Sequence, residues 1–283
     1  MSNEFSVSMC VYGGDNAAHF DAALSSVIEQ TLKPTEIVLT VDGPIPESIE
    51  AVINKYQQTM NGSIAFKVIR LEKNVGHGEA RRVCFDNCSC DLIALMDADD
   101  ISVPERFQKQ IHYFSDHPDV SVVGGYITEF ITADDPMDIS QKAGSRIVPE
   151  ADEEIKQYMK KRCPMNQVTV MFKKDDVAEV GGYIDWYCEE DYYLWIRLAL
   201  AGKQLGNIPE NLVNVRVGEE MYQRRGGWRY FKSEARLQKL MLDKKIISCG
   251  RFLINLGERL VLQVLMPNKI RGLLFQIVAR KKG

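Results

Sequence analysis

The chain has 283 residues, which is enough for one large domain or for a domain with an extension. Hydrophobic residues make up 45% of it and charged residues 26%, which excludes disordered, collagen-like and low-complexity proteins. The net charge of -4 is uneven: residues 221–283 hold 15 Lys and Arg against three acids, a net +12, and the residues before them carry -16. The sequence therefore predicts an acidic body with a basic C-terminal part.

The cysteines and the N-terminal residues indicate the cellular compartment of the protein. Seven cysteines are an odd number for a disulfide framework, which favours a reducing environment, and they lack the spacing of a zinc site. The N-terminal residues have neither the basic nor the apolar region of a signal peptide, and no run reaches the roughly 18 apolar residues of a membrane span. We therefore expect a cytoplasmic protein that contacts membranes from the surface.

Strands and helices alternate along the first 120 residues. Strands are predicted at residues 5–11, 36–41, 64–71 and 91–96, and helices around 20–28, 47–60 and 78–88. This alternation is typical of a parallel sheet with helices on both faces. Ligands of such sheets bind beyond the carboxyl ends of the strands, where Asp42, residues 74–81 and residues 97–100 are expected to lie.

The remaining chain has a different pattern. We expect an extended segment at 120–130, a polar loop through 146, a helix at 150–161, a strand at 168–172 and a helix that begins at the acidic triplet 189–191. From about residue 224 onward the pattern is helical and basic. The sequence thus predicts a catalytic domain at 1–220 and a basic helical extension at 221–283.

Three carboxylates, Asp97, Asp99 and Asp100, directly follow an apolar strand. Their repulsion at the end of a buried strand has to be offset by a cation or by hydrogen bonds. Mg²⁺ and Mn²⁺ suit such a cluster, because they take one or two carboxylates and complete their shell with water and phosphate oxygens. On spacing alone, a turn with a helix-capping Asp before Pro104 fits equally well.

Several segments together resemble glycosyltransferase family 2, the GT-A enzymes of bacterial surface-polysaccharide assembly. In chain order they are SVSMCVY, SSVIEQT, EIVLTVDG, NVGHGEARR, LMDADD, GGY and EEDYYLWIRLA. The resemblance covers roughly residues 5–202. It implies an α/β fold of the GT-A type, a Rossmann-like and mostly parallel sheet flanked by helices, with a nucleotide-sugar donor across the ends of the first four strands.

The resemblance also implies roles for individual residues. Those around the donor are Tyr12 and Asp42 for the base and ribose, Asn74, Gly76 and Arg81 for the nucleotide pocket, Asp97 for the ribose, and Asp99 for a Mn²⁺ or Mg²⁺ between the two phosphates. Taken singly, Gly76 also fits a plain turn and Arg81 a solvated helix position. The family's second acid after strand two is Gly43 here and its Asn after Ala-Arg is Arg82, which leaves base recognition open.

Glu190 and Asp191 match the acidic pair of the family. The resemblance implies that Asp191 is the general base that takes the proton from the acceptor hydroxyl. Its place at a helix start favours the ionised form but also lowers its basicity. An ordinary acid in the first turn of a helix fits the local sequence equally well.

The basic C-terminal part allows two interpretations. Arg224 and Arg225 lie in a Gly-containing segment that could close over a pyrophosphate or face lipid. Beyond residue 250, apolar and basic residues alternate as in a helix at a membrane interface, which predicts an anionic membrane surface as partner and a position at the inner face of the cytoplasmic membrane. The alternative is a helical pair packed on the body or in a homodimer.

The resulting hypothesis is an inverting, metal-dependent glycosyltransferase that moves a sugar, by family habit from UDP, to a hydroxyl of a glycan or lipid-linked acceptor. A sugar nucleotidyltransferase stays an alternative, although it would need a basic phosphate loop where residues 12–17 contain no Lys or Arg. A non-catalytic membrane-bound scaffold is a second alternative. Nucleic acid is not an expected partner, because the body is acidic and no binding module is recognisable.

Overall fold

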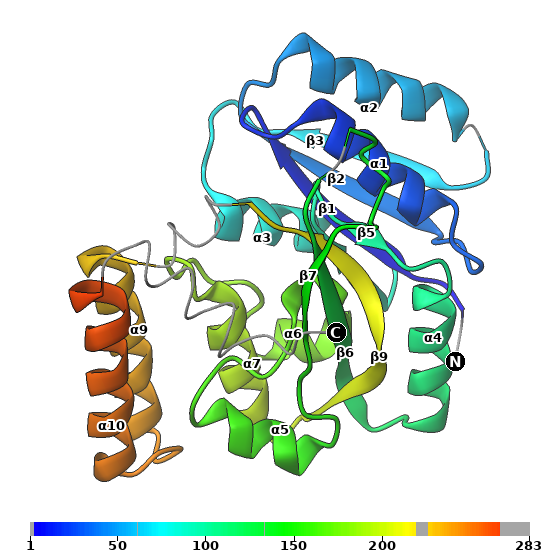
Figure 1. Ribbon diagram of the computed structural model, residues 1–283. Helices are drawn as coiled ribbons and strands as arrows, with labels where there is room; N and C mark the ends of the chain where they lie inside the picture. The colour runs from blue at the N-terminus through cyan, green and yellow to red at the C-terminus, as the bar shows by residue number, and fades with distance from the viewer. Residues whose placement is uncertain (1–2, 61, 133, 219–225, 267–283) are drawn as a thin grey trace.

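The computed structural model describes residues 3–60, 62–132, 134–218 and 226–266. A central sheet is covered by helices on both faces, and a pair of C-terminal helices lies beside the body (Figure 1). Arg224 and Arg225 lie outside the described residues.

The elements are given in chain order. The strands are β1 (Ser6–Tyr12), β2 (Glu36–Asp42), β3 (Ala65–Arg70), β4 (Leu92–Met96), β5 (Ile101–Ser102), β6 (Val120–Phe130), β7 (Lys142–Arg146), β8 (Met171–Lys173) and β9 (Gln204–Arg216). The helices are α1 (Ala17–Ile28), α2 (Glu47–Thr59), α3 (His77–Asn87), α4 (Arg106–Asp116), α5 (Asp152–Met159), α6 (Lys174–Glu179), α7 (Glu190–Leu200), α9 (Trp228–Asp243) and α10 (Cys249–Arg259). Two short turns complete them, the 3₁₀ turn η1 (Gln167–Thr169) and the π-helical turn η2 (Leu260–Leu265).

The sheet has the order β3-β2-β1-β4-β8-β6-β9-β5, and β7 pairs with β6. The first four strands are parallel, in a register that aligns Tyr12 with Asp42 and Met9 with Met96. The other half is mixed: β8 is antiparallel to β4 and β6, whereas β6 and β9 are parallel. The carboxyl ends of β1, β2, β3 and β4 therefore meet at one edge of the sheet.

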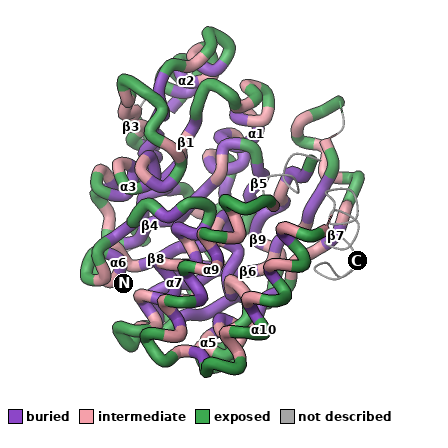
Figure 2. The backbone as a smooth tube through the Cα atoms, turned by 90° about the vertical axis from the view of Figure 1, so that its left-hand side faces the viewer, coloured by how far each residue is buried: buried purple, intermediate pink, exposed green. Residues whose placement is uncertain are grey.

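Alternating side chains of the strands build a separate core on each face. One core joins β1, β2 and β4 to α1, α2 and α4, and includes Met9, Leu24 and Phe107. The other joins Val38 and Leu95 to α3, α5, α7 and α9. Figure 2 shows long buried stretches along β6 and β9. Helices therefore pack on both faces of the sheet.

The predicted strands of the first 96 residues agree with β1 to β4, and the predicted helices with α1 to α3. The polar loop expected through 146 instead contains β7. The expected strand at 168–172 is split into η1 and β8, and α4, α6 and the long strand β9 were not predicted. β9 contains Gly206, Asn207 and Pro209, which resemble a turn; a register shift between Gly125 and Tyr126 of β6 accommodates them.

The C-terminal helices pack on the body. Leu237 and Met241 of α9 share the core that contains Trp195 of α7. The Trp186 indole donates to the Ser233 carbonyl at 3.3 Å, and the Ser233 hydroxyl donates to the Tyr187 carbonyl at 2.6 Å. In the described part of the chain, no helix combines the length and apolarity needed to cross a bilayer.

Candidate functional site

The loops after β1, β2, β3 and β4 form one surface, and the start of α7 joins it. Asp42 and the segment after β3 lie side by side, and Asp97, Asp99 and Asp100 follow β4. The start of α7 reaches the same place, because a Cβ added at Gly78 of α3 would lie 3.8 Å from the Cβ of Glu190. Segments far apart in sequence thus converge at the edge of the sheet predicted for the donor.

Asp42 fixes the loop after β3. Its two carboxylate oxygens accept from the backbone amides of Val75 at 2.7 Å and Gly76 at 3.1 Å. Gly76 has a φ of 93° at the start of α3, and Gly43 has a φ of 84°, both in the region that favours glycine. A Cβ on Gly43 would lie 2.5 Å from the Asn74 amide nitrogen. Buried Asp42 and Gly43 therefore hold the loop at 74–76 against β2.

The loop after β1 is packed just as closely. Tyr12 is 45% exposed, and a Cβ on Gly14 would lie 2.5 Å from its ring. A Cβ on Gly13 would lie 2.6 Å from the carbonyl oxygen of Pro44 in the loop after β2. Tyr12 is therefore a solvent-accessible ring at the strand end, where a base could stack on it.

Arg81 is buried beneath the site. Its Nη2 pairs with Asp97 Oδ1, and its Nε donates to His77 Nε2 at 3.1 Å. Burial raises the pKa of Asp97, but the Arg81 charge outweighs this and brings the pKa below its ordinary value. His77 Nδ1 in turn lies 3.4 Å from Glu190 Oε1. The chain Asp97, Arg81, His77 and Glu190 connects the predicted donor side to the acidic pair.

Asp99 and Asp100 have different surroundings. Asp100 is buried, and its Oδ1 accepts from the Arg216 amide at 2.8 Å. The Arg216 side chain donates to the Asp99 carbonyl at 2.8 Å. Asp99 is exposed at the surface, where partial desolvation by the surrounding protein and the charges of Asp97 and Asp15 raise its pKa to about 6. The negative charge around the Asp99 carboxylate favours a bound cation.

The acidic pair begins α7. Burial raises the pKa of Glu190, but the neighbouring His77 outweighs it and holds the pKa below its ordinary value. Burial and the Glu190 charge raise the pKa of Asp191 to about 6. Asp191 Oδ1 accepts from the Tyr192 amide at 2.6 Å, and Oδ2 lies 3.8 Å from Cys163 Sγ. One carboxylate of the pair is thus held ionised, while the other has the raised basicity that suits proton transfer.

The structure brings together nine of the predicted site residues. They are Tyr12, Asp42, Asn74, Gly76, Arg81, Asp97, Asp99, Glu190 and Asp191. The solvated position considered for Arg81 is wrong, because its side chain is buried and paired. Sequence reasoning missed His77, although its place between Gly76 and Arg81, at four residues before Arg81 on a helix, is a signal for contact with Arg81.

A cation would find few protein ligands here. Among the described residues, no group of three or more His, Cys, Asp or Glu side chains is arranged to hold a metal ion. Asp97 is paired with Arg81, which leaves Asp99 as the carboxylate best placed for a cation. That donor set fits Mg²⁺ or Mn²⁺, which typically binds one or two carboxylates together with substrate phosphates.

Comparison with known proteins gives a family and several relatives. The model of the family described as "Glycosyl transferase family 2" matches residues 6–175. The amylovoran biosynthesis glycosyltransferase AmsE of Erwinia amylovora is 35% identical over 276 residues, which cover 96% of this chain and 98% of the relative. The UDP-Gal:alpha-D-GlcNAc-diphosphoundecaprenol beta-1,3-galactosyltransferase of Escherichia coli is 32% identical over 278 residues, which cover 98% of this chain and 97% of that protein.

Solved structures share the fold. TarS 1–349 of S. aureus in complex with UDP-GlcNAc has a TM-score of 0.62 at 15% identity, over 98% of this chain and 76% of that one. The mannosyltransferase PcManGT of Pyrobaculum calidifontis, in complex with GDP-Man and Mn²⁺, has a TM-score of 0.63 at 13% identity, over 98% of this chain and 73% of that one. These similarities confirm the predicted GT-A fold.

Proposed function

Because the chain belongs to glycosyltransferase family 2, we propose that it moves a sugar from a UDP-sugar to a hydroxyl of a lipid-linked acceptor during synthesis of a bacterial surface polysaccharide. The observation that carries this proposal is the convergence of the donor loops and the acidic pair at one edge of the sheet, connected through Arg81 and His77. Donor and acceptor groups must meet at such a place for transfer to occur.

The donor part of the mechanism depends on the four loops. The loop at 74–76, held by Asp42, and the exposed ring of Tyr12 would bind the nucleoside, as the resemblance implies. Asp97, kept ionised by Arg81, would accept hydrogen bonds from the ribose. Asp99 would hold Mn²⁺ or Mg²⁺, which when bound neutralises charge on the leaving diphosphate. Arg224 and Arg225 stay proposed pyrophosphate contacts outside the described residues.

The acceptor part depends on Asp191. The acceptor hydroxyl gives its proton to the Asp191 carboxylate as its oxygen forms a bond to the anomeric carbon. The bond from that carbon to the phosphate oxygen breaks, and the nucleoside diphosphate leaves with the electron pair. Attack from the face opposite the leaving group inverts the anomeric configuration. Glu190, held by His77, would keep Asp191 basic through its negative charge.

One relative supports the choice of nucleotide and acceptor, and one solved structure of the same fold contains a UDP-sugar. The Escherichia coli relative is named for UDP-Gal as donor and a GlcNAc diphosphoundecaprenol as acceptor, and TarS was solved with UDP-GlcNAc. We accordingly place the protein at the inner face of the cytoplasmic membrane, with 1–220 as its catalytic domain and 221–283 as the extension that brings it to the lipid. Family membership makes the nucleotidyltransferase and the non-catalytic scaffold unnecessary as explanations.

A donor screen tests the proposal. The protein is incubated with a panel of UDP- and GDP-sugars, a GlcNAc-diphospholipid and Mn²⁺, and nucleoside diphosphate release is measured. We expect acceptor-dependent UDP release that chelation stops and that Asp99→Asn lowers by at least about 100-fold. Asp116→Asn, at an exposed acid outside the site, is the matched control and should leave the rate unchanged. Full activity in the presence of chelator would remove the metal role, and no transfer from any donor would remove the proposed function.

A further inference from the structure

The outward side of α10 and η2 is mostly apolar, with the exposed acid Glu258 among its residues, and their inward side is polar. Towards the body they bury Asn255, Arg259 and Gln263, which are spaced four residues apart. The exposed apolar side chains are Leu253 at 61%, Ile254 at 53%, Val261 at 49%, Leu262 at 39% and Leu265 at 67%. A helix on a water-exposed surface normally has the reverse arrangement. We call these five residues the outer apolar face.

The polar contacts of the inward side fix this orientation. Asn255 Nδ2 donates to the Lys160 carbonyl at 2.9 Å, and Arg259 Nη2 donates to the Lys161 carbonyl at 3.0 Å. Arg259 Nε lies 3.0 Å from Glu234 Oε1 of α9. Rotating α10 to bury its leucines would break these bonds and leave a buried carboxylate unpaired, which is costly. The outer apolar face is therefore a fixed property of the fold.

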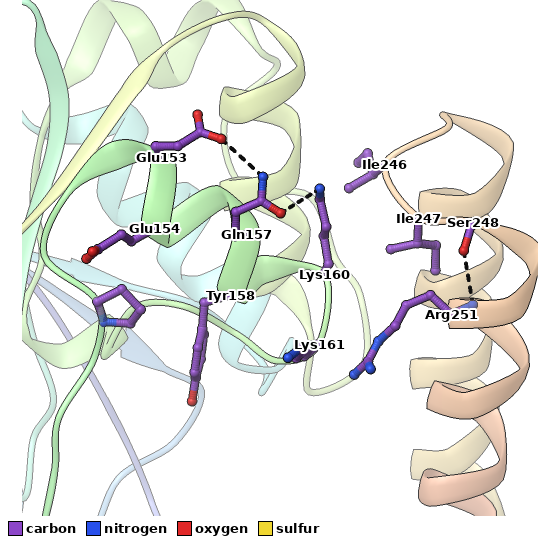
Figure 3. A pocket seen from close by; sticks show the side chains of 11 residues that line it. Glu153, Glu154, Gln157, Tyr158, Lys160, Lys161, Ile246, Ile247, Ser248 and Arg251 are labelled. Atoms are coloured by element: carbon purple, nitrogen blue, oxygen red, sulfur yellow. Dashed lines mark hydrogen bonds between the residues drawn. The ribbon is translucent and has the colours of Figure 1, made fainter.

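An open surface cavity of about 680 Å³ lies beside this helix, between α5 and the turn that joins α9 to α10. Its cationic lining residues are Lys160, Lys161 and Arg251, and Ile246 and Ile247 are apolar. In Figure 3, Arg251 reaches from α10 towards the segment after α5, with Glu153 and Glu154 on the opposite side of the cavity.

Among the described residues, none of these three cations has an acidic partner. Lys160 Nζ donates to the neutral Gln157 Oε1 at 2.8 Å. Within the described ranges, Lys161 and Arg251 form no ion pair, and Arg251 Nε is buried without a hydrogen-bond partner. Two unpaired cations facing one cavity fit a phosphate group, which offers several acceptor oxygens.

The cavity and the outer apolar face adjoin. Arg251 and Ile254 are three residues apart on α10 and are therefore neighbours on its surface. Lys244 and Lys245, both exposed, lie in the turn before α10. At the other end, Trp228 is 57% exposed, and the Gly227 amide donates to the Gln263 carbonyl at 2.9 Å. Apolar side chains bordered by cations and an exposed Trp are typical of a surface that lies in a membrane interface.

We propose that α10 and η2 lie in the interface of an anionic bilayer, with the outer apolar face among the acyl chains and a lipid headgroup phosphate between Lys161 and Arg251. This rests on the proposed function, because a lipid-linked acceptor brings the enzyme to a membrane. Charge decides against a second copy as the occupant: a two-fold contact through this face would bring the cations of both copies together. The sequence after residue 266 adds five more cations, Lys269, Arg271, Arg280, Lys281 and Lys282.

Flotation of the full chain with vesicles tests the proposal. We expect binding to phosphatidylcholine vesicles that contain phosphatidylglycerol and much weaker binding to phosphatidylcholine alone. Leu253→Glu with Ile254→Glu should lower the partition coefficient more than about tenfold. Lys161→Gln with Arg251→Gln should lower it about fivefold for each cation, on anionic vesicles only. Leu200→Glu, at a similarly exposed apolar residue of α7, is the control and should bind as the wild type does.

A variant that binds vesicles more strongly than the wild type serves as a second test, because misfolding would not explain stronger binding. Glu258 is an exposed acid on α10, and Glu258→Gln should strengthen binding to anionic vesicles. On addition of vesicles, the fluorescence emission of the exposed Trp228 should shift to the blue, whereas the other two Trp residues are already buried and should not contribute to the shift. Flotation of the Leu253→Glu, Ile254→Glu variant at the wild-type level would overturn the proposal. So would a dimer, seen by light scattering, that these substitutions dissociate.

The assay separates this inference from the proposed function. It uses no donor, so vesicle binding without any sugar transfer would contradict only the proposed function. Transfer to a GlcNAc-diphosphate acceptor without a lipid tail, in a protein that does not float, would contradict only the membrane face. The binding variants should keep wild-type transfer to that soluble acceptor, since none of the changed residues lies in the site.

Discussion

The buried side chain of Arg81 pairs with Asp97 and lowers the pKa of that carboxylate. Because it is buried, it would act on the proposed nucleotide only through Asp97 and His77, which it contacts. His77 accepts from Arg81 at Nε2, so its proton is on Nδ1, which faces Glu190. The imidazole thereby fixes the side chain next to the proposed base. We infer that His77 is a positioning residue.

The pKa of Asp191 predicts the pH dependence of transfer. The base must be ionised to accept a proton, and its pKa is raised to about 6 by burial and by Glu190. We therefore expect kcat/KM to be constant above about pH 7 and to fall about tenfold per pH unit below about pH 6. Steady-state rates at subsaturating acceptor, from pH 5 to 8, measure this. A profile that is flat down to pH 5 would remove Asp191 as the base.

At the scale of elements, the loop contacts explain how the edge of the sheet is kept in shape. The loops after β1 and β2 approach each other at Gly13 and Pro44, and the loop after β3 approaches at Gly43. Glycine is needed at Gly43 both for its φ of 84° and for the space that a Cβ would take from Asn74. Where the family usually has an acid, this chain therefore has Gly43, whose backbone lies close to that of Asn74.

Gly43→Ala tests this contact. Gly62→Ala is a matched control, because Gly62 has a similar φ of 94° but nothing within 4 Å of an added Cβ. Both variants should lose about 1–2 kcal/mol of stability from the positive φ. Only Gly43→Ala should also weaken UDP binding, by roughly ten- to a hundredfold, because it displaces the loop at 74–76. Calorimetric titration with UDP measures the difference, and equal affinities would contradict the role of this loop.

The C-terminal helices combine the two interpretations that the sequence allowed. The half-buried side chain of Phe252 packs against the core that contains Trp195, as the packed-pair alternative expects. Leu253, Val261 and Leu265 remain exposed, as an interfacial helix requires. The sequence could not show which side chains of α10 and η2 are buried. Their buried side consists of Asn255, Arg259 and Gln263, which are residue types expected on a solvent-exposed face.

For the whole molecule, local sequence patterns were sufficient to predict the first half of the fold. Apolar runs followed by glycine or acidic residues predicted β1 to β4 and the loops that form the site. The other half depends on contacts that local patterns do not contain. Arg106 and Gln110 of α4 are buried and donate to the Leu95 and Thr169 carbonyls at 2.7 and 2.8 Å, so the buried face of this helix looks polar in sequence.

The positions of the candidate site residues could be predicted to a similar extent, whereas their roles stay predictions. Family motifs placed Asp42, Asp97 and the pair Glu190 and Asp191 at strand and helix ends that the structure brings to one place. The contact from His77 to Glu190 could not be predicted, since it depends on how closely α3 approaches α7. The burial that raises the pKa of Asp191 depends likewise on packing between elements distant in sequence.

The raised pKa of Asp191 links its protonation to the stability of the fold, and this supplies a control for the catalytic test of Asp191→Asn. The folded-state pKa of Asp191 is above its ordinary value near 3.8, so its contribution to stability is present at low pH and is lost as pH rises through about 6. Asp191→Asn should therefore melt at a higher temperature than the wild type at pH 7.5. It should also bind UDP normally and turn over about 100- to 10,000-fold more slowly, so unfolding would not explain the loss.

The anomeric configuration of the product tests whether transfer is a direct displacement with Asp191 as the base. Direct displacement with Asp191 as the base requires that an α-linked UDP-sugar, identified by the donor screen, gives a β-linked product. Proton NMR of the product, through the coupling constant of the anomeric proton, measures this for a sugar such as galactose. We expect the wild type to form a β-linkage at a rate that Asp191→Asn loses; an α-linked product would contradict direct displacement.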